Sequence, residues 1–217
     1  MPTQCGIDEA GRGPVIGPIV ICGVLVDEKD LPHLEAIGVK DSKLLTARRR
    51  EALIKEITAI AKGIKTLIVH PLEIDAAVGS ESINLNWLEA LKSADIINAL
   101  NPESAILDCP SPNINAYRSY VRERLDKKET TLIVEHKADL HHISVGAASI
   151  IAKVTRDAEI ESLKKHVGID FGSGYMADER TSAFLAQNWN KHPEIFRHSW
   201  APYKKIIQSC HQQKLSS

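Results

Sequence analysis

The sequence has few cysteines, and no two of them are close together. They are Cys5, Cys22, Cys109 and Cys210. The absence of a CxxC pair excludes a zinc ribbon and predicts a reduced, intracellular protein. No basic segment followed by a long apolar run opens the chain. The longest apolar run, residues 19–26, is interrupted by Gly23 and is too short to cross a bilayer. We therefore expect a cytoplasmic protein with no membrane partner.

Other common signatures are missing as well. The sequence contains no GxxxxGK[ST] loop, no repeat with a period of 20–50 residues and no low-complexity tract. The formal net charge of −1 and the isoelectric point of about 6.8 neither predict nor exclude nucleic-acid binding. Locally, residues 40–56 carry six basic against three acidic side chains, and residues 191–217 carry five against one. Such segments are compatible with a polyanionic partner and also with solvated helix faces.

The overall composition is that of a globular protein. The chain has 217 residues and a mass of 23.9 kDa, with 43% hydrophobic and 25% charged residues. This size accommodates one large domain with a small appendage. The composition excludes a disordered chain.

Strand and helix patterns alternate through the second half of the sequence. Apolar runs between turn signals predict strands over residues 4–8, 17–26, 64–69, 104–108 and 130–135. Helical spacing predicts helices over residues 46–62, 84–100, 113–125, 144–166, 181–190 and 201–209. Thr46 and Ser144 are the predicted N-caps of two of these helices. The pattern predicts an α/β fold with a mixed sheet, flanking helices and a small helical C-terminal extension.

Acidic residues stand at or just after the ends of three predicted strands. They are Asp8 with Glu9, Asp108 and Asp139. Strand ends at one edge of an open sheet meet at a crevice, where four carboxylates would repel one another unless a cation neutralised them. Oxygen ligands without a thiolate or imidazole pattern favour Mg²⁺ or Mn²⁺, and two such ions suit attack by water on a phosphodiester. The alternative is that each acid is an isolated surface residue.

A glycine-rich turn follows the first acidic pair directly. Gly11 and Gly13 allow close approach of backbone N–H groups to a ligand, and Arg12 between them can bind a phosphate. A dinucleotide fingerprint is the competing interpretation. It fits poorly, because Gly17 comes one residue late for GxGxxG and a strand-like run follows where a helix should begin.

Several motifs, in order, resemble those of type 2 ribonucleases H, and ribonuclease HII in particular. The first is residues 6–14, Gly-Ile-Asp-Glu-Ala-Gly-Arg-Gly-Pro. The others are residues 39–44, 107–110 with Asn113, 135–139, 149–157 and 173–175. The resemblance runs from about residue 5 to 180 and is closer to archaeal and eukaryotic members than to bacterial ones. It implies a ribonuclease H-like fold with a five-stranded mixed sheet, a catalytic domain over residues 1–176 and a helical extension over residues 177–217.

The resemblance also implies roles for individual residues. The metal-binding and catalytic residues would be Asp8, Glu9, Asp108 and Asp139. The substrate-binding residues would be Gly11, Arg12, Gly13, Lys40, Ser42, Lys43, Lys153 and Tyr175. Of these, the glycine turn and Tyr175 would recognise the 2′-OH and phosphate at an RNA–DNA junction, which is chemically sensible because the 2′-OH distinguishes RNA from DNA.

The implied activity is endonucleolytic hydrolysis of the RNA strand in RNA–DNA hybrids. It includes incision on the 5′ side of single ribonucleotides in duplex DNA, leaves 3′-OH and 5′-phosphate ends, and uses two Mg²⁺ or Mn²⁺ ions. The implied roles are repair and primer removal by a monomer. We predict no sliding-clamp partner, because residues 212–217 lack the paired aromatics of a clamp-binding motif. Two alternatives stay open: an inactive nucleic-acid-binding module on the same fold, and a nucleotide-dependent oxidoreductase built on the glycine turn.

Overall fold

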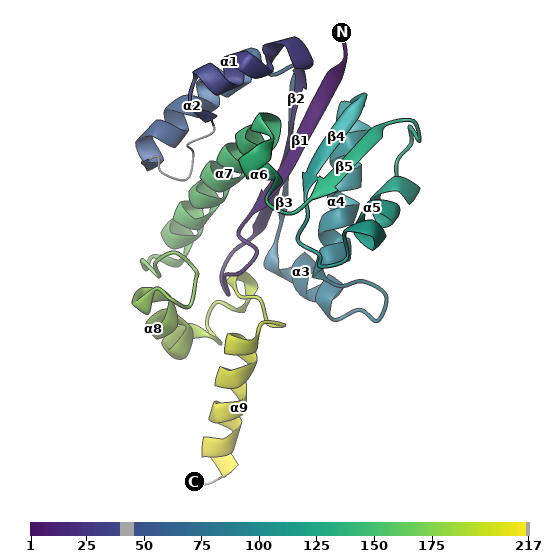
Figure 1. Ribbon diagram of the computed structural model, residues 1–217. Helices are drawn as coiled ribbons and strands as arrows, with labels where there is room; N and C mark the ends of the chain where they lie inside the picture. Colours follow the sequence, from purple (N-terminus) through teal and green to yellow (C-terminus); the bar gives the residue numbers. More distant parts are fainter. Residues whose placement is uncertain (40–45, 216–217) are drawn as a thin grey trace. The chain divides into compact units, whose positions relative to one another are not determined.

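A five-stranded sheet with helices on both faces forms the larger part of the protein (Figure 1). The computed structural model describes residues 1–39 and 46–215. The strands are β1 (Thr3–Ala10), β2 (Ile19–Asp27), β3 (Gly63–Val69), β4 (Ser104–Asp108) and β5 (Thr131–Glu135). The helices described are α1 (Leu31–Ala36), α2 (Ala47–Ile60), α3 (Pro71–Val78), α4 (Leu85–Leu100), α5 (Ile114–Glu123), α6 (Ala138–His141), α7 (Ile143–Val167), α8 (Glu179–Asn188) and α9 (Ala201–Leu215). The 3₁₀ turns described in full are η1 (Glu28–Asp30) and η3 (Pro193–Ile195).

The sheet has the strand order β3-β2-β1-β4-β5, with β1 in the centre. Strand β1 pairs antiparallel with β2 and parallel with β4, and β4 pairs parallel with β5. This confirms the predicted mixed five-stranded sheet. The parallel register brings the carboxyl ends of β1, β4 and β5, where the acidic residues stand, to the same edge of the sheet.

The described chain forms two compact units. Unit 1 contains most of the sheet and comprises residues 1–10, 20–68 and 85–155. Unit 2 comprises residues 11–19, 69–84 and 156–217. The predicted domain boundary at residue 176 stays a prediction.

Within unit 1, the two faces of the sheet receive different helices. Gly6 on β1 packs against the start of α7, where a Cβ would lie 2.1 Å from the carbonyl carbon of Ser144. Gly23 on β2 packs against α4, where a Cβ would lie 2.3 Å from Ile96 Cγ2. Because side chains alternate across a strand, β1 sends its even-numbered residues toward α7 and its odd-numbered ones toward α4.

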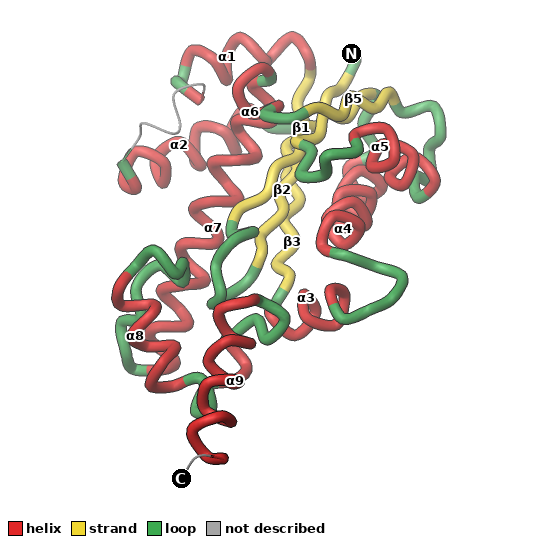
Figure 2. The backbone as a smooth tube through the Cα atoms, turned by 60° about the horizontal axis from the view of Figure 1, so that its bottom comes forward, coloured by secondary structure: helices red, strands yellow, loops and turns green. Residues whose placement is uncertain are grey.

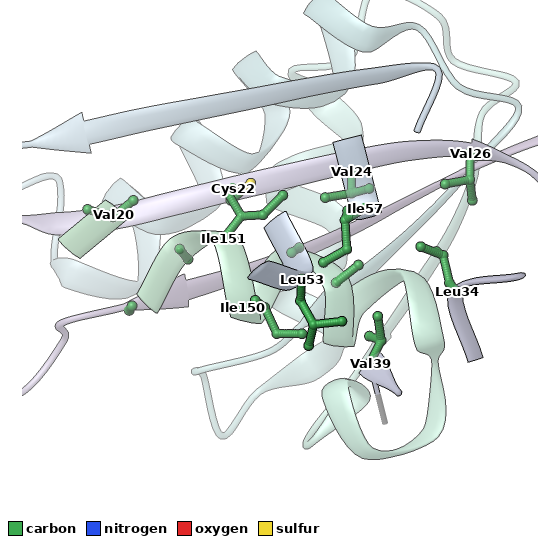
Figure 3. Close-up of a cluster of buried hydrophobic side chains, with 14 residues drawn as sticks. Val20, Cys22, Val24, Val26, Leu34, Val39, Leu53, Ile57, Ile150 and Ile151 are labelled. Atoms are coloured by element: carbon green, nitrogen blue, oxygen red, sulfur yellow. The ribbon is translucent and has the colours of Figure 1, made fainter. Parts of the chain in front are cut away.

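The α7 face of the sheet covers an aliphatic core. Strand β2 contributes Val20, Cys22, Val24 and Val26. These side chains pack against side chains from α1, α2 and α7 (Figure 3). Cys22 is fully buried, as is Cys5 on the other face, and both are free thiols that pack as small core residues. Full burial of one such aliphatic side chain contributes about 1.5–3 kcal/mol, so this cluster stabilises α2 and α7 on the sheet.

Unit 2 has its own core, which is rich in aromatic rings. Phe184 on α8 packs against Phe171 and Phe196, with ring centroids 5.4 and 5.8 Å apart. Phe196 in turn meets Tyr203 on α9 at 5.6 Å. These contacts join α8, η3 and α9 around the short bridge between Ile16 and Phe196.

Most predicted elements are present, and the differences have local causes. Helices α1, α3 and α6 were not predicted: the first two are short helices with proline in the first turn, and α6 is a single turn. Thr46 caps α2 as predicted, accepting a hydrogen bond from the Arg49 N–H. Ser144 was wrongly predicted as an N-cap, because α7 begins at Ile143 and the Ser144 hydroxyl donates instead to Gln4 Oε1 at 2.8 Å. No described helix is long and apolar enough to span a membrane.

The tube view shows that β2 follows the glycine turn directly, with no helix between them (Figure 2). A dinucleotide fingerprint requires a helix at this point. The turn therefore lacks the local structure on which the oxidoreductase alternative depends.

Candidate active site

Asp8 lies on the central strand β1 and is only 6% exposed. Its position on the even-numbered side of the strand directs it toward α7, where the buried Ser149 hydroxyl donates a hydrogen bond to it. The Ser149 oxygen also accepts a hydrogen bond of 2.5 Å from Lys153 Nζ. A lysine one turn further along α7 is thus connected to Asp8 through a single hydroxyl.

The electrostatics of Asp8 disfavour its charged form. Burial, and then the negative charge of Asp108, raise the pKa of Asp8 to about 6, although the hydrogen bonds from Ser149 and from the Glu9 N–H and the charge of Lys153 oppose the shift. The Glu9 N–H donates at 2.8 Å. The protein holds two carboxylates close together at this edge of the sheet, and one lysine near Asp8 does not restore its normal acidity.

Asp108 ends β4, and its carboxylate fixes the start of α6. Asp108 Oδ1 accepts a hydrogen bond of 3.1 Å from the backbone N–H of Ala138. The turn before α6 contains Lys137 in the left-handed conformation, with φ of 59°, which is unusual for a residue with a side chain. The chain accepts this conformation because β4 and β5 hold the turn on both sides: the Cys109 N–H donates to Glu135 O at 2.9 Å, and His136 Nδ1 lies 2.8 Å from Cys109 O.

Asp139 follows Ala138 in the first turn of α6 and is partly exposed. Because the Ala138 N–H is bonded to Asp108, the next residue, Asp139, is held near Asp108. The sequence correctly placed Asp139 near a strand end, but it gave no sign of the left-handed turn that brings it there.

Glu9 occupies the other face of β1. Burial raises the pKa of Cys109 and of Tyr117, and negative charges add to both shifts: Asp108 and then Glu9 at Cys109, and Glu89 and then Glu9 at Tyr117. Among residues 1–39 and 46–215, no three histidine, cysteine, aspartate or glutamate side chains converge as a ready metal site. The four predicted carboxylates thus share one sheet edge without forming a closed set of ligands.

The glycine turn lies in unit 2, together with Tyr175. Gly11 has φ of +85°, and a Cβ there would lie 2.6 Å from Arg156 Cδ and 2.7 Å from Pro18 O. The Tyr175 ring lies against Gly13, where a Cβ would stand 3.5 Å from Tyr175 Cε1. That the turn and Tyr175 act together in recognition stays a prediction.

The loop that carries Tyr175 is well supported. Thr181 Oγ1 accepts from the Gly174 N–H at 3.0 Å and donates to Phe171 O at 2.8 Å. Asp178 caps α8 and also accepts from the Ser173 N–H at 2.8 Å. The Arg156 guanidinium donates to Ser173 O at 2.8 Å and lies 5.0 Å from the centre of the Tyr175 ring. Tyr175 remains 40% exposed, so its hydroxyl end can meet a ligand.

Three predicted substrate-binding residues, Lys40, Ser42 and Lys43, lie outside the described residues. Lys153 is described and binds Ser149, so its contact with phosphate stays a prediction. Sequence reasoning gave no role to Ser149 or Arg156. For Ser149 a signal was available, since it lies four residues before Lys153 and hence on the same face of α7.

Comparison with known proteins identifies the family. The family model described as ribonuclease HII matches residues 5–203. The chain belongs to the ribonuclease HII family. These proteins are endonucleases of the hydrolase class, so the chain is assigned as an enzyme.

Individual relatives agree with the family assignment. Ribonuclease HII from the archaeon Pyrococcus furiosus is 46% identical over 214 residues, which cover 96% of this chain and 93% of the relative. The crystal structure of ribonuclease H2 from Pyrococcus horikoshii superimposes with a TM-score of 0.87 at 42% identity, covering 95% of this chain and 98% of that one. Ribonuclease HII from Archaeoglobus fulgidus, solved as a complex with PCNA, gives a TM-score of 0.81 at 40% identity, covering 91% and 95%. The ribonuclease H-like fold expected from the motifs is therefore confirmed.

Proposed function

We propose that this ribonuclease HII hydrolyses the RNA strand of RNA–DNA hybrids and incises duplex DNA on the 5′ side of single embedded ribonucleotides, leaving 3′-OH and 5′-phosphate ends. The observation that carries the proposal is the pair Asp8 and Asp108 at the ends of neighbouring parallel strands, where burial raises the pKa of Asp8 to about 6. A protein gains no stability from two carboxylates placed in this way. Their value lies in the cation that they can attract.

The donor set suits a hard divalent cation. Asp8, Glu9, Asp108 and Asp139 offer only carboxylate oxygens, which Mg²⁺ and Mn²⁺ prefer. Asp8 and Asp108 would hold the cations jointly, with Glu9 and Asp139 completing their coordination. Two divalent cations would supply charge neutralisation at the phosphate and a more acidic bound water. Ser149 would keep the Asp8 carboxylate oriented, and Lys153 would add positive charge on the same side.

Recognition is assigned to the glycine turn and Tyr175. Gly13 is exposed and its Cα faces the Tyr175 ring, so a sugar can approach the backbone where a side chain would stand in its way. The Tyr175 hydroxyl can bond a 2′-OH while its ring packs on the sugar. Arg12 and the lysines Lys40, Lys43 and Lys153, with Ser42, would bind phosphates.

The proposed biological role is removal of misincorporated ribonucleotides and primer RNA by a monomeric enzyme. The Archaeoglobus fulgidus relative was solved with PCNA. For this chain a clamp contact stays outside the proposal.

An incision assay tests the proposal. A labelled DNA duplex with one ribonucleotide is incubated with the enzyme in Mg²⁺, in Mn²⁺ and in EDTA, beside an all-DNA duplex and a continuous hybrid. We expect metal-dependent incision 5′ of the ribonucleotide and no cutting of the all-DNA duplex. Cutting of the hybrid alone would remove the single-ribonucleotide activity. Salt-dependent binding without cutting of either would favour the inactive binding module.

A further inference from the structure

Arg197 is a buried arginine far from the predicted site in sequence. It lies in unit 2 between η3 and α9 and is 0% exposed, the largest of the fully buried side chains. An arginine stays protonated in proteins, and burying its charge is costly unless its donors are satisfied. The partners that satisfy this guanidinium therefore indicate what it is for.

The Arg197 guanidinium holds the glycine turn through backbone carbonyls. Its Nη2 donates to Gly11 O at 2.6 Å, its Nη1 to Arg12 O at 2.9 Å and its Nε to Gly17 O at 2.9 Å. The three nitrogens of the planar guanidinium thus each bind one backbone carbonyl of the segment between β1 and β2. A lysine, with a single ammonium on a flexible chain, cannot reproduce this pattern.

Fixing two consecutive carbonyls also fixes the direction of the next two N–H groups. In a trans peptide the C=O and the following N–H point in opposite directions. With the Gly11 and Arg12 carbonyls directed at Arg197, the N–H groups of Arg12 and Gly13 point away from it. Those are the groups expected to meet a phosphate, and the guanidinium places a permanent positive charge behind them.

The residues around Arg197 extend the same contact. The Trp200 indole Nε1–H donates to Gly13 O at 3.2 Å, and the Arg197 guanidinium lies 4.9 Å from the centre of the Trp200 ring. The Arg197 N–H donates to Val15 O at 2.9 Å, and the Gly17 N–H donates to Ile195 O at 2.9 Å. The segment 195–200 therefore holds the turn at five residues by both its backbone and its side chains.

We infer that Arg197 is a positioning residue for substrate recognition, which sets the glycine turn in the orientation that reads the ribonucleotide, with Trp200 as its support. The inference rests on the proposed function of the turn. It adds a role for a residue that touches no substrate and lies 186 positions from Gly11.

The test measures recognition separately from the amount of active enzyme. For each variant, KM and kcat are determined on the single-ribonucleotide duplex, and the inhibition constant Ki of the all-DNA duplex as competitor is determined in the same assay. The ratio of Ki to KM reports discrimination and does not change when part of the enzyme is merely unfolded. We expect Arg197→Lys to lower this ratio about tenfold, corresponding to about 1.4 kcal/mol, while kcat falls less than threefold.

Two further variants make the result decisive. Arg122→Lys is the matched control, since Arg122 also donates to backbone carbonyls, those of Lys128 and Thr130, but on a loop of unit 1; its ratio should not change. Trp200→Phe removes the hydrogen bond to Gly13 O, keeps an aromatic ring in place of the indole that lies beside the Arg197 guanidinium, and serves if Arg197→Lys does not fold; we expect a threefold decrease. An unchanged ratio in a folded Arg197→Lys or Trp200→Phe protein overturns the inference. A wild-type enzyme that does not discriminate overturns the proposed function instead.

Discussion

The Ser149 hydroxyl donates a hydrogen bond to the Asp8 carboxylate, joining α7 to the central strand at a point where both side chains are buried. The same hydroxyl accepts from Lys153, so the three groups form one chain of hydrogen bonds. Buried polar groups are stable only when their partners are present. The geometry around Asp8 therefore gives direct predictions.

Asp8 should make the metal-free protein less stable as the pH rises. Its folded pKa of about 6 lies above the ordinary aspartate value of 3.8, so the folded state holds the proton more tightly than the unfolded state. The penalty is absent below pH 3.8, grows between pH 3.8 and 6, and then levels off at about 3 kcal/mol. Urea unfolding in EDTA should show Asp8→Asn gaining stability over the wild type at pH 7.5 but not at pH 4. An equal difference at both pH values would contradict the assigned pKa.

Divalent metal should reverse that penalty in the wild type. We expect Mn²⁺ or Mg²⁺ at one hundred times its Kd to raise the free energy of unfolding by about 2.7 kcal/mol at pH 7.5. The gain should be smaller at pH 5, where protons compete for Asp8, and should disappear in Asp8→Asn together with cleavage. Thermal melts in metal and in EDTA measure it. Full metal stabilisation of Asp8→Asn would remove Asp8 from the ligand set.

Gly11→Ala should damage the turn more than its backbone conformation alone explains. Gly168 provides the control: it has φ of +74° just after α7, and nothing lies within 4 Å of a Cβ there. We expect Gly168→Ala to cost about 1 kcal/mol from backbone strain and Gly11→Ala about 3 kcal/mol, because its methyl group also meets Arg156 and Pro18 O. Denaturant unfolding compares the two. Equal costs would indicate that the turn adjusts freely.

Tyr175→Phe should separate the hydroxyl from the ring. The ring contacts with Gly13 and Arg156 remain, so the free energy of unfolding should stay within about 0.5 kcal/mol of the wild type. Loss of one hydrogen bond to the 2′-OH should lower cleavage at a single ribonucleotide about tenfold. Tyr175→Ala should reduce both cleavage and stability. Wild-type cleavage by the phenylalanine variant would exclude the hydroxyl from recognition.

The sheet and the placement of most acids could be predicted because their signals are local. The apolar run over residues 104–108 predicts a strand that ends at Asp108, as β4 does. Thr46 is a typical N-cap residue and correctly predicts the start of α2. The carboxyl ends of parallel strands meet at one edge of a sheet, so the sequence alone predicts that Asp8 and Asp108 lie close together.

What could not be predicted depends on contacts between distant segments. No local pattern indicates that Lys137 adopts a left-handed turn, because the conformation is imposed by β4 and β5 on either side. From the sequence, Arg197 is indistinguishable from a surface arginine, because it lies in a basic segment. Only its hydrogen bonds to three backbone carbonyls show that it is buried against the glycine turn. Serine is a common N-cap residue, but the Ser144 hydroxyl donates its hydrogen bond to Gln4 instead.

The hydrogen bond between Arg197 and Gly11 also bears on when the glycine turn can become fixed during synthesis of the chain. A ribosome makes Gly11 186 positions before it makes Arg197. The aliphatic core around β2 can form from segments made earlier, but the turn cannot reach its final orientation until residue 197 has been added. A nascent chain therefore contains its four acidic residues well before Arg197 can fix the glycine turn, so any selectivity that depends on the fixed turn develops after the carboxylates have been made.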